Sequence, residues 1–514
     1  MNLFIIDIRY ANMNKRNFTH YLILALCAVI LQLYPNVLYS SDSANLERQI
    51  KSFTLDNGLQ VLMMERHINP TVSLYIRYRA GAVDEGEGQT GLAHLLEHMM
   101  FKGTKTIGTK SFKKEQKILR DIDVTGQALD MELARGDKAD KSKIDKLKAN
   151  LKLLQERHKP LIISNEIDRL YKENGATGLN ASTGQDLTTY HVSLPSNKIE
   201  LWARIESDRM INPIFREFYQ ERDVVLEEQR QRVEANPEGK LYEAFLGAAF
   251  LAHPYRRPVI GWKSDIQHLT MNDLKSFYSR HHAPGNTVIA VVGDIDPEKV
   301  KKLIVKYFGS IPNHRNLKRP MTEEPLKTGE KRVNIALDAN PHLIIGFHKP
   351  PPPDSDDDVF EMIESILSRG RTSRFYKTLV EKKGIAEDVQ ASNGTPGSRY
   401  ANLFAIFASP RHPHSSSELE TSIIDMIDQL KKEPVSEKEL QKVKNQVRAD
   451  FIHRQSSNSG MASMLSYYQA LLGDFRYMIT YIDRIDKISS DDIMRVAKKY
   501  LTTDNRTVAT IVKE

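Results

Sequence analysis

The sequence predicts an α+β protein in which two tandem, homologous units, each an antiparallel sheet with helices, are joined by a linker. The ends of the two units match: residues 271–293 and 490–512 each combine an acidic helix start, an amphipathic helix, a short turn with Asn and an apolar strand. Their openings also match, because residues 72–78 and 342–347 are apolar strands that each precede a helix. Two similar segments in the same order indicate a tandem duplication.

The composition excludes several classes of protein. The 514 residues are 40% hydrophobic and 27% charged, which is ordinary for a globular protein and excludes a polytopic membrane protein, a collagen-like chain and wholesale disorder. The net charge of +7 is mild and no tight basic tract stands out, so no nucleic-acid partner is expected. With Cys27 as the single cysteine, no intrachain disulfide and no cysteine-based metal site can form.

Residues 1–40 are predicted to be a secretory signal peptide. Lys15 and Arg16 precede an apolar run at residues 21–33, which small polar residues follow. The run is short for a membrane-spanning helix, although an uncleaved membrane anchor is the alternative, and Met13 is an alternative start. We therefore expect an exported, periplasmic protein with no stable membrane insertion after cleavage.

The first unit is expected to span residues 46–312, with an insertion at residues 111–174. The insertion is densely charged, and apolar residues recur at helical spacing on both sides of Arg135-Gly136-Asp137. This pattern predicts a protruding helical hairpin, either a solvated spacer or a docking or gating element. Residues 313–332 are polar and charged and are expected to form the linker, so that residues 333–514 make the second unit.

The sharpest chemical pattern lies at residues 91–104, which contain His94, Glu97 and His98. On a helix, residues i and i+4 share a face, so both imidazoles can bind one metal ion. Glu97 lies on that face and can take a proton from a water molecule at the metal. The order H-x-x-E-H reverses the commoner H-E-x-x-H of zinc peptidases. The alternative is a pair of surface histidines.

A catalytic zinc ion usually takes three protein ligands and a water molecule, so a third ligand is needed. The best source is the acidic helix expected at residues 221–230, where Glu221 and Glu228 are two turns apart on one face and Glu227 points elsewhere. Taken alone, such a helix is more often solvated surface.

These motifs together resemble the pitrilysin/insulinase family of inverted zinc metallopeptidases, in particular its half-size, processing-peptidase-like members. The matching stretches are HLLEHMMFKGT, NASTGQDLTTYHVSLP, ERDVVLEE, HPYRRPVIG and NTVIAVVGDID, in family order across most of residues 50–312, and more loosely LSRGRTSRFYKTLVEKKG. The resemblance implies the following roles: His94, His98 and Glu228 as ligands of one Zn²⁺ per chain, Glu97 as the general base, Glu221 as a second acidic residue that supports catalysis, and Asn180 and Ala181 as substrate-binding residues on an edge strand.

Two departures from the family pattern stand out. His98 and Glu228 are 130 residues apart, longer than is usual, and the inserted hairpin accounts for the excess. Active members also hold the substrate with an Arg and a Tyr of the C-terminal domain, and here those positions are Val380 and Glu387. The second unit has Glu361, Glu364 and Ser365 where the first has its motif, so no second zinc site is expected.

The sequence thus predicts a zinc-dependent endopeptidase that hydrolyses peptides or unfolded polypeptides. We expect it to be the zinc-bearing subunit of a homo- or heterodimer whose sister subunit supplies the missing Arg and Tyr. The alternative is a non-catalytic assembly or peptide-binding subunit. Val380 and Glu387 favour this alternative, and the intact motif argues against it.

Overall fold

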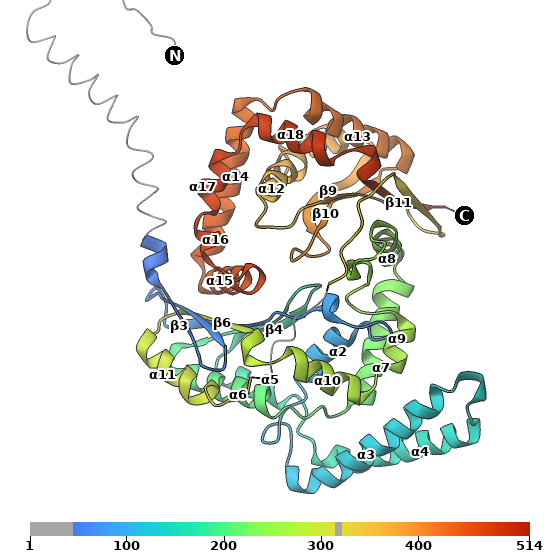
Figure 1. The fold of residues 1–514 in the computed structure, drawn as a ribbon, viewed down its shortest axis with the longest axis vertical. Coiled ribbons are helices and arrows are strands. Elements are labelled where there is room, and N and C mark those ends of the chain that lie inside the picture. The colour runs from blue at the N-terminus through green and yellow to red at the C-terminus, as the bar shows by residue number, and fades with distance from the viewer. Residues whose placement is uncertain (1–44, 314–320, 514) are drawn as a thin grey trace, which may run out of the picture. The chain divides into compact units, whose positions relative to one another are not determined.

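The computed structural model describes residues 45–313 and 321–513, so the predicted signal peptide at residues 1–40 lies outside the described residues. The predicted fold class is confirmed: the described chain contains two mixed sheets, each with its own set of helices (Figure 1).

The first sheet is built from six strands in the order β1-β2-β6-β3-β5-β4. Their bounds are β1 Ile50–Thr54, β2 Gln60–Glu65, β3 Thr71–Tyr78, β4 Thr177–Thr183, β5 Thr188–Pro195 and β6 Thr287–Gly293. The expected antiparallel sheet is wrong in one respect, because β2 and β6 run parallel while β3 pairs antiparallel with both β6 and β5. A parallel pair needs a long crossover rather than a tight hairpin, and here most of the first unit separates the two strands.

In the sequence, the helices of the first unit lie between β3 and β4, between β5 and β6, and after β6. Their bounds are α2 Leu92–Met99, α3 Phe112–Leu133, α4 Lys141–His158, α5 Glu166–Glu173, α6 Ile199–Ile211, α7 Phe218–Gln229, α8 Pro237–Ala249, α9 Lys263–His268, α10 Met271–His281 and α11 Pro297–Phe308. The buried faces of α2, α6, α10 and α11 join the strands in one hydrophobic core.

The second unit repeats this order. Its strands are β7 Lys331–Ala336, β8 Leu343–Lys349, β9 Ala386–Thr395, β10 Asn402–Pro410 and β11 Arg506–Val512, and its helices are α12 Ser355–Ser368, α13 Ser416–Lys432, α14 Glu437–Ser456, α15 Asn458–Leu472, α16 Arg476–Ile479, α17 Tyr481–Lys487 and α18 Ser490–Tyr500. The strand order β7-β11-β8-β10-β9 corresponds to β2-β6-β3-β5-β4, including the one parallel pair. The same topology twice in one chain supports the duplication inferred from the sequence.

One helix of each unit packs on the sheet of the other unit. Helix α8 of the first unit packs on β7, β8 and β11, where Phe245 is fully buried against Gly346, whose missing side chain leaves room for the ring. Helix α15 of the second unit packs on β3 and β6, where Ser459 and Ser466 hydrogen bond to Tyr75 (2.8 Å) and Arg77 (2.9 Å). This exchange ties the two units together.

The inserted segment forms an antiparallel pair, α3 and α4, that extends from the first unit (Figure 1, cyan). At its base the buried Glu115 of α3 accepts hydrogen bonds from Arg216 Nε (2.7 Å) and Nη2 (2.9 Å), and its Oε1 lies 2.6 Å from Nε2 of His158. The hairpin ends at His158, earlier than the expected residue 174. Helix α5 is a separate helix whose Ile167 and Tyr171 are buried in the core, which is why it belongs to the body of the unit.

In the predicted linker, residues 313–332, the described residues 313 and 321–330 contain no helix or strand, and the last two residues already belong to β7. Among the described residues, no helix combines the length and apolar character needed to cross a bilayer.

Candidate metal centre

Helix α2, which carries the H-x-x-E-H motif, begins at a tightly constrained turn. Gly91 has φ = 86°, and a Cβ at this position would lie 2.5 Å from the carbonyl oxygen of Ile260, so glycine is required. The buried carboxylate of Glu85 accepts hydrogen bonds from the backbone N–H groups of Gly91 (3.0 Å) and Ala93 (2.7 Å). It thereby satisfies donors that a helix start leaves without partners.

The structure brings together the three predicted ligands. His94 and His98 share one face of α2, and Glu228 near the end of α7 faces them. Oε2 of Glu228 lies 3.8 Å from Nε2 of His94 and 3.7 Å from Nε2 of His98, and one ligand atom from each residue lies within 4.8 Å of the others. Glu228, which follows His98 by 130 residues in the sequence, is thus placed so that it could bind a metal ion together with the two histidines.

This donor set fits a zinc ion. A tetrahedral ion with bonds of about 2.0–2.1 Å places its ligand atoms about 3.4 Å apart, so small side-chain rotations would close the observed separations. Burial, with the positive charges of His98 and Arg232, lowers the pKa of His94 to about 3, which keeps this imidazole in the neutral form that binds metals. Two imidazoles and one carboxylate leave a fourth position open, as catalytic zinc sites require.

Glu97 lies beside the three ligands but is held by a different partner. The hydroxyl of Thr183, the last residue of β4, donates a hydrogen bond to its Oε2 at 2.6 Å. Burial raises the pKa of Glu97, and the hydrogen bond from Thr183 opposes that rise only in part. A carboxylate with a raised pKa next to a metal site is suited to accept and return a proton.

Glu221 is not part of the group that could bind a metal ion. Its carboxylate instead contacts Nδ1 of His98, the ring nitrogen that does not face Glu228. Its Oε1 lies 2.9 Å from Nδ1 of His98, and its Oε2 lies 2.5 Å from Nζ of Lys102. Burial opposes ionisation of Glu221, but the hydrogen bonds from His98 and Lys102 outweigh it and lower the pKa of Glu221 to about 2. Burial likewise disfavours a charged His98, yet the hydrogen bond to Glu221 raises the pKa of His98.

Glu228 has a cationic partner of its own. Arg232, in the π-helical turn Arg230–Glu234 that continues α7, lies 2.5 Å from Oε1 of Glu228 and leaves Oε2 toward the histidines. Glu227, by contrast, is half-exposed and pairs with Arg230, as the sequence predicted for a residue on another face.

Sequence reasoning missed Lys102, Thr183 and Arg232. Their spacing could have found them: Lys102 and Arg232 each follow a predicted ligand by four residues, and Thr183 lies two residues after Ala181 on the same strand.

The predicted substrate-binding residues Asn180 and Ala181 lie on β4, which is the edge strand of the first sheet. They pair with His191 and Tyr190 of β5, after an irregularity in register between Thr177 and Asn180. Helix α2 packs against β4, so the open edge of this strand begins beside Glu97.

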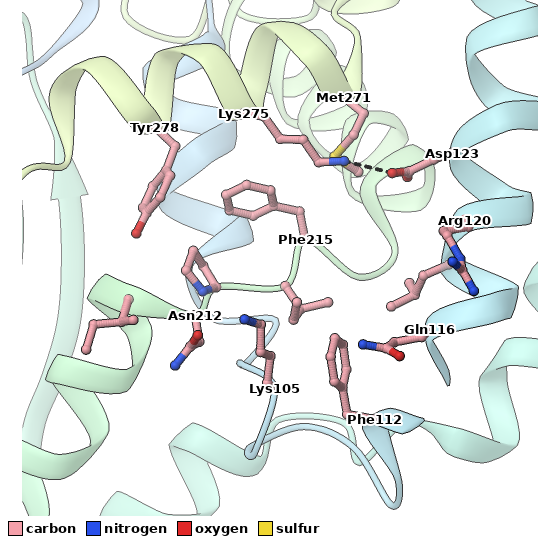
Figure 2. Close-up of a pocket in the computed structure, with 14 residues that line it drawn as sticks. Lys105, Phe112, Gln116, Arg120, Asp123, Asn212, Phe215, Met271, Lys275 and Tyr278 are labelled. Atoms are coloured by element: carbon pink, nitrogen blue, oxygen red, sulfur yellow. Dashed lines mark hydrogen bonds and ion pairs between the residues drawn. The ribbon is translucent and has the colours of Figure 1, made fainter. Parts of the chain in front are cut away.

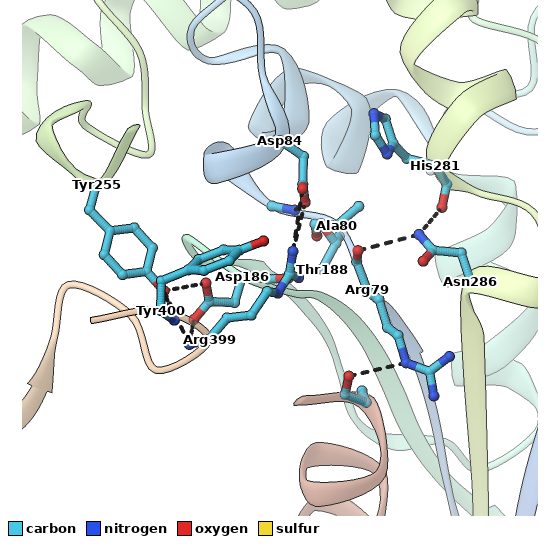
Figure 3. Close-up of polar contacts among 12 residues, drawn as sticks. Arg79, Ala80, Asp84, Asp186, Thr188, Tyr255, His281, Asn286, Arg399 and Tyr400 are labelled. Atoms are coloured by element: carbon cyan, nitrogen blue, oxygen red, sulfur yellow. Dashed lines mark hydrogen bonds and ion pairs between the residues drawn. The ribbon is translucent and has the colours of Figure 1, made fainter. Parts of the chain in front are cut away.

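The two positions where the family resemblance implies an Arg and a Tyr are occupied by residues of different chemistry. Val380 lies in the π-helical turn Tyr376–Lys382, and Glu387 is exposed in β9. The β9–β10 loop does contain Arg399, but its guanidinium pairs with Asp84 (3.3 Å) and with the backbone carbonyl of Asp186 (Figure 3). Arg399 therefore serves to join the second unit to the first.

A cavity of about 520 Å³ lies away from these residues, between α3 and α10 (Figure 2). Phe112, Phe215 and Tyr278 line it, and Lys275 closes one side through its ion pair with Asp123 (2.7 Å). None of the predicted site residues lines this cavity. The candidate metal centre is therefore identified by its residue types and their geometry, not by the volume of a cavity.

Two family profiles match the chain. The profile described as "Insulinase (Peptidase family M16)" matches residues 60–123 and 162–262, and the one described as "Peptidase M16 inactive domain" matches residues 268–447. The two segments of the insulinase profile leave residues 124–161 unmatched, which covers the C-terminal part of α3 and all of α4, the helices of the inserted hairpin.

Related proteins cover nearly the whole chain. The zinc protease PqqE of Helicobacter pylori is 28% identical over 458 residues, 88% of this chain and 90% of that protein. An uncharacterized zinc protease of Rickettsia felis is 24% identical over 455 residues, 87% of this chain and 94% of that protein. The crystal structure of a protease from Helicobacter pylori is similar with a TM-score of 0.76 and 25% sequence identity, covering 90% of this chain and 99% of that one.

Proposed function

Because this chain belongs to the insulinase family, peptidase family M16, we propose that it is a zinc-dependent endopeptidase that hydrolyses peptides or unfolded polypeptides. The observation that carries the proposal is the convergence of His94, His98 and Glu228, with the carboxylate of Glu97 on the same helix face. Relatives are named zinc proteases, and the donor set fits that metal.

The chemistry divides between the metal and Glu97. A bound Zn²⁺ lowers the pKa of water toward neutrality and polarises a peptide carbonyl. Thr183 engages Oε2 of Glu97, and Oε1 makes no hydrogen bond within the described part of the chain, so Oε1 is the atom that receives the proton of the attacking water. Glu97 then returns this proton to the departing amine, which cannot leave as an anion at neutral pH.

Substrate binding is assigned to the edge of β4. Asn180 and Ala181 lie on a strand that pairs on one side with β5, and an extended peptide can add to the other side through backbone hydrogen bonds. Such binding reads the backbone more than the side chains, which suits a peptidase for short or unfolded chains.

We further propose that this chain works as one subunit of a homo- or heterodimer. Val380 and Glu387 cannot donate hydrogen bonds as Arg and Tyr do, so the substrate clamp of the family would come from a sister subunit. A second copy of this chain carries the same two residues, so only the heterodimer can supply the clamp. The segment at residues 1–40 supports export to the periplasm as part of this proposal.

The proposal is tested by zinc analysis and hydrolysis of a quenched fluorescent peptide by the dimeric complex, with wild type and Glu97→Gln. We expect one zinc ion per chain in both proteins and a loss of about a thousandfold in kcat/KM in the variant. Glu227→Gln, which removes a half-exposed carboxylate from α7, next to Glu228 in the sequence, is the matched control and should retain full activity.

Zinc-free wild-type protein, or equal hydrolysis by Glu97→Gln, would contradict the proposal. Zinc binding and peptide binding without hydrolysis in every assembly would instead favour the alternative that Val380 and Glu387 suggest, a non-catalytic peptide-binding subunit.

A further inference from the structure

Lys102 lies four residues after His98 and three residues after the end of α2, and its ammonium group contacts Glu221 of α7. Nζ of Lys102 lies 2.5 Å from Oε2 of Glu221 and 3.6 Å from a carboxylate oxygen of Glu217. Its side chain is only 24% exposed, and that of Glu221 is 13% exposed, so this ion pair is screened by water much less than a surface pair.

Glu221 transmits this contact to a predicted zinc ligand. While Oε2 pairs with Lys102, Oε1 accepts the hydrogen bond from Nδ1 of His98 at 2.9 Å. An imidazole whose Nδ1 carries the hydrogen has its lone pair on Nε2, and Nε2 is the atom that faces Glu228. Within the described residues, His94 has no such support, because its buried Nδ1 makes no hydrogen bond.

The backbone at Lys102 is held as firmly as its side chain. The fully buried Arg216 donates hydrogen bonds to the carbonyl oxygens of Lys102 (3.1 Å) and Thr104 (2.6 Å), while Glu115 at the base of the hairpin neutralises its charge. The next residue, Glu217, has φ = 60°, a left-handed conformation that is costly for a non-glycine residue. These contacts fix the point from which Lys102 reaches Glu221.

The local charge balance also depends on Lys102. Glu217, the residue before α7, and Glu221, in the first turn of α7, both have a carboxylate oxygen within 4 Å of Nζ of Lys102, so their like charges lie close together and repel. Among the described residues, the ion pairs of Glu221 are those with His98 and Lys102. Without Lys102, Glu221 would be left between a second carboxylate and an imidazole that must be neutral to bind a metal.

We propose that Lys102 is a positioning residue of the metal centre: it holds Glu221 in the orientation that presents Nε2 of His98 to the zinc ion. The inference rests on the proposed zinc site and assigns a role to a residue that touches neither the metal nor the substrate. Mutation of a residue that hydrogen bonds to or orients a metal ligand commonly lowers metal affinity by about 10- to 100-fold.

The test is zinc affinity, measured by competition with a chromophoric chelator, in full-length Lys102→Met. We expect affinity to fall about 10- to 100-fold, whereas Lys102→Arg, which keeps a cation that can donate to a carboxylate, stays within about threefold of wild type. The matched control is Lys105→Met: Lys105 lies on the same loop, is exposed, and makes no ion pair or hydrogen bond in the described part of the chain. Its zinc affinity should equal that of wild type.

A double-mutant cycle separates positioning from general loss of stability. If Lys102 acts through Glu221, Lys102→Met should cause no further loss of zinc affinity in a Glu221→Gln background. Additive losses, or equal affinities of Lys102→Met and wild type, would overturn the proposal. If Lys102→Met does not fold, Lys102→Gln serves in its place with the same expectation. Wild-type protein that binds no zinc would defeat the proposed function itself, a result distinct from failure of this inference.

Discussion

Helices α2 and α12 occupy equivalent places in the two units but carry different chemistry. Each follows the corresponding strand, β3 or β8, and each packs on an edge strand, β4 or β9, and on a long helix, α7 or α14. In each case the edge strand holds a glutamate of the helix: Thr183 donates to Glu97 at 2.6 Å, and the backbone N–H of Asn393 donates to Glu364 at 2.8 Å.

The facing helices explain the difference. Helix α7 presents Glu228 to two imidazoles, whereas α14 presents Arg454 to the carboxyl groups of Glu361 and Glu364. Burial, with the nearby charge of Glu361, raises the pKa of Glu364 to about 7. The same scaffold thus holds a candidate metal site in one unit and a pair of carboxyl groups in the other, and a few side chains make the difference.

The largest expected effect is on zinc affinity, when the two histidines of α2 are replaced by the residues at the equivalent positions of α12. His94→Glu combined with His98→Ser removes two of the three ligands, so zinc affinity should fall by about a thousandfold or more. The helix should still fold, because α12 carries this set in the same setting. Chelator competition and circular dichroism measure the two results. Retained zinc binding would mean that the metal lies elsewhere in the chain.

A smaller effect is expected from Glu364→Gln. Because the folded-state pKa of Glu364 is raised, its protonated form stabilises the fold below the ordinary pKa of 4.5, and this stability is lost as pH rises through about 7. The neutral amide should therefore increase stability over wild type by about 1–3 kcal/mol at pH 8 and by little at pH 5. Urea unfolding at both pH values measures this. Glu381→Gln, at an exposed site, is the control, and a gain that does not depend on pH would refute the assignment.

The smallest effect is expected from the reverse graft. Glu361→His with Ser365→His creates H-x-x-E-H in α12, since Glu364 already stands between them. The zinc content should nevertheless remain one per chain, because the positive charges of Arg369 and of Arg454 on α14 act on this face of α12 and disfavour a bound metal ion. Elemental analysis of the purified variant decides; two zinc ions per chain would show that the facing helix does not control metal binding.

Local elements were predictable because their signals lie within a few residues. The apolar strand expected at residues 72–78 matches β3, and the spacing of His94 and His98 placed both on one face of α2. The parallel pairing of β2 with β6 was not predictable, because strand direction depends on how distant segments return to the sheet. The end of the hairpin was placed too late because α5 is as charged as α3 and α4, and only its packing in the core separates it from them.

The candidate site also combines features that the sequence indicates with features that depend on the tertiary structure. Sequence alone indicated the duplication and the two imidazoles with Glu97 beside them, since each depends on residue type and short-range spacing. The expectation that Val380 and Glu387 replace an Arg–Tyr clamp came from the family resemblance. Only the tertiary structure showed that the carboxylate of Glu228 lies within reach of the two imidazoles, that Glu221 contacts Nδ1 of His98, and that Lys102 and Thr183 contact Glu221 and Glu97. These contacts join segments about 80 to 130 residues apart, and packing of the sheet and helices, rather than any local pattern, brings them within hydrogen-bonding distance.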